Sequence, residues 1–245
     1  MPVKLIKDYY IKRKPKIMRN FAKDLEHIRK LLRNKFTEVK IDEMLNEMKM
    51  DFEKILPEIP YIGGIKNTST SIMVESMSSL AMFRVLEREG LTLREIGEIF
   101  YELCDLSAVI RKENFSKIGV DPATLQFDPA KVELTKKRCE ISRLKDFPDD
   151  SVMDFVDGEG KSFEWGLNVY ECGIHKAFKK LGAEKYVHLI CLADYSAANI
   201  FGYGFTRTQS IGFGASMCDH RYIKNYKTPK GWPPDNLQEY QEIKV

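Results

Sequence analysis

The spacing of the apolar residues changes along this chain, and that change constrains the fold more than any other feature. Between residues 16 and 106, apolar side chains recur every three or four positions, which is the period of a helix. From residue 163 onward, short segments alternate apolar and polar residues, as strands do. The two patterns follow one another, which predicts an α+β fold with an N-terminal helical bundle packed with a C-terminal small antiparallel sheet and helices.

Breaker residues and capping motifs set the expected boundaries of these elements. Thr92 and Glu95 form a capping-box pattern at the start of one helix, directly after Gly90 as a natural helix end. The expected helices span residues 16–36, 41–56, 70–90, 92 to beyond 106, 131–147, 170–181 and 186–201, and the expected strands span 152–156, 163–169, 203–213 and 218–223.

These elements divide the chain into three expected regions. Residues 1–56 form an N-terminal helical region, 57–224 form the main domain, and 225–245 form an irregular tail over the surface. The methionines of the second helix fit core positions better than a ligand box, because methionine packs adaptably.

The composition indicates a globular protein without a nucleic-acid or membrane partner. The chain has 245 residues, of which 43% are apolar, so a full core can form. Lysine and arginine number 39 against 36 acidic residues, which gives a net charge of +3 and no strong basic field. No apolar stretch approaches the roughly 18 residues that span a bilayer, and the basic N-terminus lacks the apolar centre of a signal peptide.

The cysteines indicate a reducing compartment. There are five, an odd number at irregular spacing and without a CxxC pair. A disulfide framework is therefore not expected, and reduced thiols in a cytoplasmic protein fit this pattern.

Three segments of the C-terminal third combine reactive side chains. In the first, Cys172 and His175 are three residues apart on an expected helix and can meet. A thiol near an imidazole is a minimal activated nucleophile, because the thiolate is the attacking species. The alternative is a buried cysteine beside a surface histidine.

The second segment is an apolar helix that carries Cys191 and Asp194 on one stripe. A carboxylate there needs a partner, because an unpaired buried charge is costly. Arg207 and Arg221 are the nearest candidates. Asp194 then belongs either to a structural salt bridge or to a functional site.

The third segment joins Arg207 to the Cys218–Arg221 strand. An arginine on a strand that faces a cavity can hold a substrate carboxylate through two hydrogen bonds. Alternation places Cys218 and His220 on one face of their strand and Asp219 and Arg221 on the other. A cross-strand ion pair between Asp219 and Arg221 is the structural alternative.

A zinc site is a further alternative for these residues. Its sulfur and nitrogen ligands would come from a set of five residues, Cys172, His175, Cys191, Cys218 and His220. The usual paired ligand spacings are not present, so neither a metal nor a cofactor is expected.

Four motifs in order carry a family resemblance. They are IPYIGG at 59–64, FxWGxNVYEC at 163–172, CLADY at 191–195 and RTQSxxxGxxxCDHRY at 207–222. Together they resemble the L-2-amino-thiazoline-4-carboxylic acid hydrolase family over roughly residues 57–224.

The resemblance implies a hydrolase that opens a carbon–nitrogen bond of a small cyclic amidine or related carboxylate. The positions that the resemblance carries over are Cys172, Cys191, Asp194, Arg207, Thr208, Gly214, Cys218, Asp219 and Arg221. We expect Cys172, His175 and Asp194 to be catalytic, and Asn168, Cys191, Arg207, Thr208, Cys218, Asp219 and Arg221 to bind substrate. Asn168 stands where members often have Asp, His220 where they often have Phe, and His175 at a position that is variable or Cys among members. These departures bear on the choice of substrate, because a changed polar group alters specificity strongly.

Two mechanisms and one rival function remain open at this point. Cys172 attacks the amidine carbon while His175 moves the proton, or Asp194 activates a water and the cysteines only line the site. The order of C-terminal elements also resembles a 4-vinyl-reductase-type ligand-binding domain, which implies a small-molecule sensor without turnover. The expected partner is a small-molecule substrate, and a homodimer is possible.

Overall fold

The computed structural model describes residues 8–159 and 162–241, and its fold is α+β, as the sequence predicts. The chain forms two compact units. The first unit holds residues 1–103 with 177–186, and the second holds residues 104–176 with 187–245. Each unit is described by itself. No helix of the described residues is long and apolar enough to cross a membrane.

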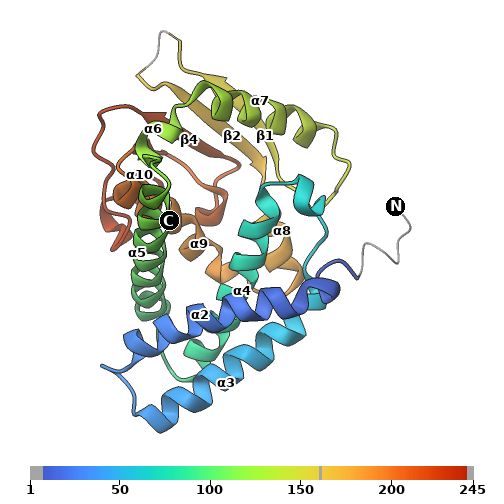
Figure 1. The fold of residues 1–245 in the computed structure, drawn as a ribbon, viewed down its shortest axis with the longest axis vertical. Helices are drawn as coiled ribbons and strands as arrows, with labels where there is room; N and C mark the ends of the chain where they lie inside the picture. Colours follow the sequence, from blue (N-terminus) through green and yellow to red (C-terminus); the bar gives the residue numbers. More distant parts are fainter. Residues whose placement is uncertain (1–7, 160–161, 242–245) are drawn as a thin grey trace. The chain divides into compact units, whose positions relative to one another are not determined.

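The first unit is helical and follows the predicted periodicity closely (Figure 1). Its elements are η1 (Ile11–Arg13), α2 (Lys14–Leu32), α3 (Glu38–Ile55), η2 (Leu56–Glu58), η3 (Gly64–Lys66), α4 (Ser69–Arg88), the first part of α5 (Leu93–Lys117), the end of α8 (Gly173–Lys180) and η4 (Glu184–Tyr186).

Apolar stripes of these helices form the core of the first unit. Met44 and Met48 are fully buried, which confirms their assignment as core residues. Phe21 and Phe52 meet edge to face with ring centroids 4.8 Å apart. The predicted capping box is also present, since Thr92 N donates to Glu95 Oε2 at 2.9 Å and Glu95 N donates to Thr92 Oγ1 at 3.3 Å.

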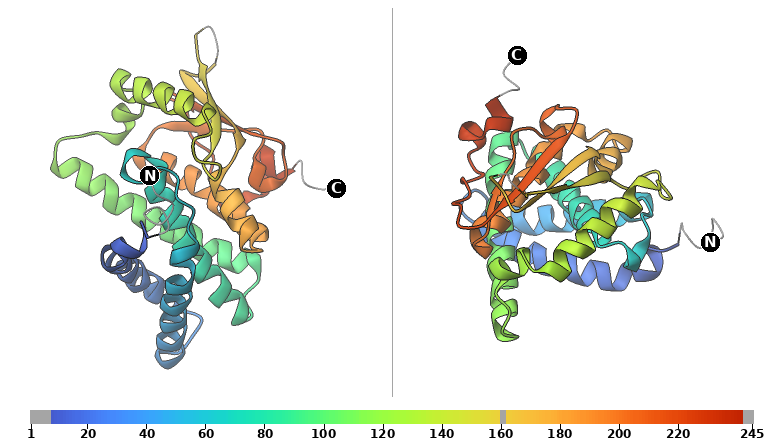
Figure 2. Two further views of the ribbon diagram at one scale, coloured as in Figure 1. Left: turned by 90° about the vertical axis from the view of Figure 1, so that its right-hand side faces the viewer. Right: turned by 90° about the horizontal axis from the view of Figure 1, so that it is seen from above.

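The second unit contains the sheet and the helices that pack on it (Figures 1 and 2). Its remaining elements are α6 (Pro122–Gln126), α7 (Pro129–Arg143), β1 (Val152–Asp157), β2 (Trp165–Glu171), α9 (Val187–Phe201), β3 (Gly204–Thr206), η5 (Ile211–Phe213), β4 (Cys218–Ile223), η6 (Pro234–Asn236) and α10 (Gln238–Gln241).

The sheet is antiparallel with the order β1-β2-β4-β3. At its β1 edge lies α7, where Ser142 Oγ donates to Met153 O at 3.2 Å and accepts from Met153 N at 3.1 Å. At its β3 edge, Phe205 N donates to Thr228 Oγ1 at 2.8 Å. Both edges therefore have part of their backbone hydrogen bonding satisfied by neighbouring segments.

The register sorts the central strands into two faces. Residues Trp165, Leu167 and Val169 pair with Tyr222, His220 and Cys218, so these six side chains share one face. Helix α9 packs against this face at β3, where the rings of Tyr195 and Phe205 lie 5.1 Å apart. The other face carries Gly166 and Asn168 with their partners Arg221 and Asp219.

Three predictions of local structure differ from the structure. The expected helix 170–181 begins only at Gly173, because Tyr170 and Glu171 continue β2, so Cys172 lies before the helix and not on it. The expected strand 203–213 forms only β3, because Ser210 caps the turn η5 through its side chain, which accepts from Gly212 N. The expected irregular tail contains η6 and α10 and is anchored by Leu237, which is 2% exposed. Apolar anchors in the tail explain why it packs.

Candidate functional site

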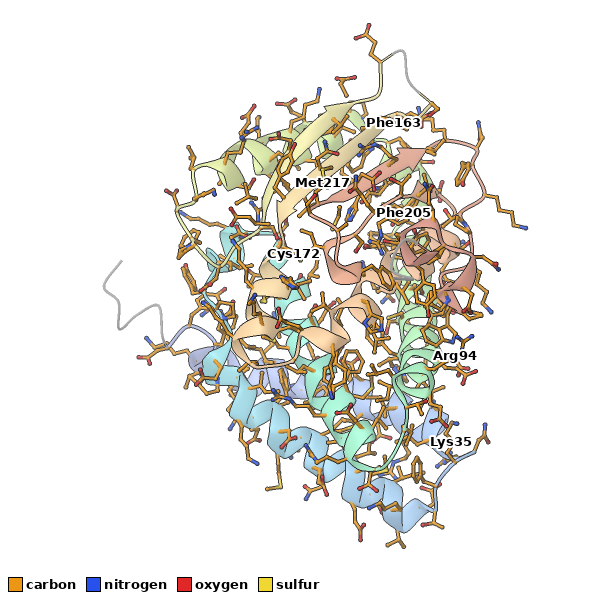
Figure 3. All side chains as sticks on the ribbon, turned by 180° about the vertical axis from the view of Figure 1, so that it is seen from behind. Lys35, Arg94, Phe163, Cys172, Phe205 and Met217 are labelled. Carbon is orange, nitrogen blue, oxygen red and sulfur yellow. The ribbon has the colours of Figure 1, made fainter. Side chains whose placement is uncertain are left out.

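Cys172 occupies the junction between β2 and α8, where it is labelled in Figure 3. Its carbonyl accepts from Lys176 N at 3.0 Å, which makes it the residue that caps α8. The backbone N–H groups of Ile174 and His175 lie near its thiol and lower its pKa. Gly173 permits the tight junction, because a Cβ there would lie 2.8 Å from Asp149 O. The sulfur thus lies at the positive end of a helix dipole.

The surroundings of Cys172 hold its thiol protonated at neutral pH. Burial raises the pKa of Cys172 to about 11, and the neighbouring Cys191 thiol acts in the same direction. The two N–H groups of α8 oppose this effect, and the Asp194 carboxylate adds to it. Cys172, Cys191 and Asp194 are therefore close enough to influence one another electrostatically.

Ser210 lies near the other two thiols of the site. Its side chain is fully buried, and its hydroxyl lowers the pKa values of both Cys191 and Cys218. Ile211 N also donates to Cys218 Sγ at 3.2 Å. Turn η5 lies so close to α9 that a Cβ on Gly212 would lie 2.5 Å from Cys191 Sγ. Burial raises the pKa of Cys191 to about 12 and that of Cys218 to about 11, so both are neutral thiols.

Arg207 is the centre of a buried ion cluster. Its Nη1 donates to Asp194 Oδ2 at 2.9 Å, and its Nη2 donates to Cys191 O at 2.7 Å. Its Nε donates to Glu239, whose other oxygen accepts from Tyr195 Oη at 2.9 Å. The side chains of Arg207 and Glu239 are 1% and 0% exposed, whereas that of Asp194 is 46% exposed. Asp194 thus connects this interior cluster to the surface.

Opposite charge keeps Arg207 ionised despite its burial. Burial alone would lower the pKa of the guanidinium, but the Glu239 and Asp194 carboxylates raise it well above its ordinary value. Asp194 pairs with Arg207, one of the two partners that the sequence suggested.

The position of Arg207 differs from the role expected for it. A guanidinium that binds a substrate carboxylate must present N–H groups to that substrate. All three nitrogens of Arg207 donate to protein oxygens, and the side chain is 1% exposed. Arg207 therefore holds the site together from inside.

Three of the expected substrate-binding residues lie on the face of the sheet opposite to Cys218. Asn168, Asp219 and Arg221 are on the other face of the sheet from Cys218. Asp219 accepts from Thr208 N at 2.8 Å and Thr208 Oγ1 at 2.6 Å, and thereby fixes the segment after β3.

Arg221 uses its guanidinium within the sheet. Its Nη2 donates to Asn168 Oδ1 at 2.9 Å, and its Nη1 donates to Leu167 O at 3.2 Å. The predicted ion pair between Arg221 and Asp219 does not form. Asp219 instead accepts hydrogen bonds from Thr208 and Gln209.

His220 lies on the same face as Cys218, as the sequence predicts. Its ring meets Phe205 edge to face at 5.5 Å. Burial lowers the pKa of His220 to about 4, and the Asp194 carboxylate opposes this effect. His220 is therefore a neutral imidazole at physiological pH.

His175 reaches Cys172 through its backbone N–H. Its imidazole belongs to the first turn of α8 and is half-buried. Among the residues that the structure describes, no group of three or more His, Cys, Asp or Glu side chains has the arrangement of a metal site.

Sequence reasoning missed Ser210 and Glu239. Ser210 lies within the expected strand 203–213, where alternation predicts an ordinary polar side chain. Glu239 follows a proline-rich segment of the tail, where a charged residue is expected to be exposed to solvent. The apolar residue Leu237 beside it was the only available signal that this tail packs.

The fold and the site define an α+β protein with a cluster of thiols around a partly exposed carboxylate. Comparison with protein families matches residues 72–222 to L-2-amino-thiazoline-4-carboxylic acid hydrolase. The chain belongs to this family, which confirms the family suggested by the motifs. Three of the four motifs lie within the matched residues, and IPYIGG at 59–64 lies outside them. Searches of curated proteins and of solved structures give no match.

Because His220 is neutral in the folded protein, the free energy of unfolding should depend on pH. An unfolded histidine takes up a proton near its ordinary pKa of 6.5, whereas the folded His220 does so only near pH 4. The unfolded state therefore binds more protons in this window, and stability falls as pH decreases from about 6.5 to about 4. Replacement His220→Phe removes this contribution, so its free energy of unfolding should fall less steeply over that window. Urea unfolding from pH 7.5 to 4 measures this difference, and parallel curves for the two proteins would refute it.

Proposed function

We propose that this protein hydrolyses a carbon–nitrogen bond of a small cyclic amidine, such as the 2-aminothiazoline ring in the family's name. Family membership supports the reaction class. The observation that carries the proposal is the placement of the Cys172 thiol at the start of α8, within electrostatic reach of the Asp194 carboxylate.

The charges of the site favour a cationic ring. Arg207 contributes one positive charge, and Asp194 and Glu239 contribute two negative charges, so the ionised cluster is net negative. A protonated cyclic amidine is a planar cation whose N–H groups can donate hydrogen bonds to a carboxylate. The half-exposed Asp194 is the member of the cluster that can receive it.

Binding of that cation also activates the thiol. The Cys172 thiol is neutral in the free protein because its pKa is raised to about 11. A positive charge within a few ångströms stabilises the thiolate, and the two N–H groups of α8 already favour it. The positive charge of the bound amidinium thus helps to ionise the thiol that attacks its carbon.

The proposed reaction has two balanced steps. The Cys172 sulfur adds to the amidine carbon, and the ring nitrogen takes up the proton and leaves as an amine while remaining attached to the rest of the molecule. Water then adds to the same carbon and displaces the Cys172 sulfur, so the oxygen of water becomes the carbonyl oxygen of the product. His175, in the first turn of α8, is the proposed proton carrier.

A direct attack by water is the competing mechanism. In that case Asp194 accepts the proton of water, and Cys172 only shapes the site. The two mechanisms differ in what remains after the sulfur is removed.

The first test replaces the sulfur and the carboxylate separately. Cys172→Ser should lower kcat by about 1,000-fold or more, because the hydroxyl is far harder to ionise than the thiol. Asp194→Asn should lower kcat/KM by about 100-fold, because it removes the charge that binds and orients the cation. Ring opening of L-2-amino-thiazoline-4-carboxylate, followed by mass spectrometry, measures both values.

Cys104→Ser provides the matched control, since Cys104 is a half-buried thiol in the same unit but outside this cluster. Its activity should equal that of the unaltered protein. Turnover that survives Cys172→Ser would eliminate the covalent step and leave the water mechanism. Binding of cyclic amidines without any turnover would eliminate the hydrolase and favour a binding module.

The second test concerns the substrate carboxylate. All three guanidinium nitrogens of Arg207 donate to oxygens of the protein, so Arg207 has no N–H group directed to the substrate carboxylate. The ring without its carboxylate, 2-amino-2-thiazoline, should therefore keep kcat/KM within about tenfold of the full acid, or about 1.4 kcal/mol. A loss of several hundredfold would show that a buried cation binds the carboxylate after all.

A further inference from the structure

Glu239 lies outside the region that matches the family, yet it is bonded to the centre of the candidate site. The family match ends at residue 222. Glu239 belongs to the four-residue helix α10 near the end of the described chain. Its side chain is 0% exposed, and it contacts Arg207 and Tyr195 through separate oxygens.

We propose that Glu239 is a positioning residue that fixes the Asp194 carboxylate through Arg207. This inference rests on the proposed function and extends the site to the C-terminal segment of residues 234–240.

The geometry supplies the first argument. A guanidinium is planar, so fixing its Nε at Glu239 also fixes the directions of its two terminal nitrogens. Those nitrogens hold Asp194 Oδ2 at 2.9 Å and Cys191 O at 2.7 Å. Glu239 therefore sets the orientation of the group that orients Asp194.

The burial of the cluster supplies the second argument. Glu239 lies fully inside, so loss of its charge leaves Arg207 with the half-exposed Asp194 as its remaining carboxylate. The guanidinium would then draw Asp194 inward and compete with the substrate cation for it. A carboxylate displaced by about 1 Å can lower turnover by about 100-fold.

Anchoring of the segment supplies the third argument. Leu237 is 2% exposed, and Leu237 N donates to Pro234 O at 2.9 Å. Tyr240 N in turn donates to Leu237 O at 3.0 Å. These contacts hold α10 so that the Glu239 carboxylate enters the interior in one orientation.

The test uses Glu239→Gln in the full chain, because Gln keeps the shape and removes the charge. We expect kcat for ring opening to fall by about 10-fold to 100-fold. Asp154→Asn is the matched control, since Asp154 is a half-buried carboxylate of the second unit that pairs with Arg143. The control should lose thermal stability while kcat stays within about twofold. Equal losses of kcat in both variants would reduce Glu239 to a structural residue and overturn the proposal.

A double-mutant cycle separates positioning from general stability. If Glu239 acts through Arg207 on Asp194, then Glu239→Gln should have little further effect on kcat in an Asp194→Asn background. Multiplicative losses in the double variant would overturn the proposal. If Glu239→Gln does not fold, Tyr195→Phe removes one hydrogen bond of Glu239 and should lower kcat about twofold to fivefold, and unchanged kcat would contradict the account.

A readout without substrate separates this inference from the proposed function. Loss of the Glu239 charge leaves the field of Arg207 less compensated at Cys191, so that thiol should react faster with iodoacetamide at pH 8. Peptide mass spectrometry measures the rate at each cysteine, with Asp154→Asn as the control. An unchanged Cys191 rate overturns the inference. Absence of turnover in the unaltered protein, with the Cys191 rate increased in Glu239→Gln, overturns only the proposed function.

Discussion

The guanidinium of Arg207 is buried together with the carboxylate of Glu239, and the candidate site depends on this pair. Removing two such charges from water costs several kcal/mol for each ion, which only close pairing and complete hydrogen bonding can offset. Arg207 meets this requirement with three partners from separate parts of the chain, Asp194 and Cys191 O on α9 and Glu239 on α10. The same bonds join a helix, the end of β3 and the C-terminal segment at one point.

This arrangement separates the function of the interior from that of the surface. Glu239 and Arg207 are inside, whereas about half of the Asp194 side chain is exposed at 46%. Besides its ion pair with Arg207, Asp194 lies near two groups that are neutral, because burial raises the thiol pKa of Cys172 to about 11 and lowers the imidazole pKa of His220 to about 4. A half-exposed carboxylate beside a neutral thiol and a neutral imidazole is suited to recognising a ligand of opposite charge.

Much of the fold could be predicted from the sequence, because local patterns determine it. The helical period located α2 and α3, the Thr92–Glu95 motif located the start of α5, and alternation located β4. The spacing also predicted that Cys191 and Asp194 share one stripe of a helix, and the thiols were named as candidate site residues, whose role stays a prediction. What bonds they make could not be read in the same way.

The missed features depend on contacts between distant segments. Ser210 lies near two thiols because η5 turns back against α9, and Glu239 is buried because Leu237 anchors the tail. Neither contact leaves a periodic trace in the sequence. The role of Arg207 was misjudged for the same reason, because its position on a strand end says which way it points but not which carboxylates fill its hydrogen bonds.

The measurement that tests the central claim most directly is the free energy of unfolding of Arg207 and Glu239 variants. If Arg207 is the interior partner of Glu239, Arg207→Met leaves a buried carboxylate unpaired and should cost about 3–5 kcal/mol. The double variant Arg207→Met with Glu239→Leu removes both charges and should recover most of that loss. A single variant as stable as the unaltered protein, or a double variant no more stable than the single one, would contradict the account.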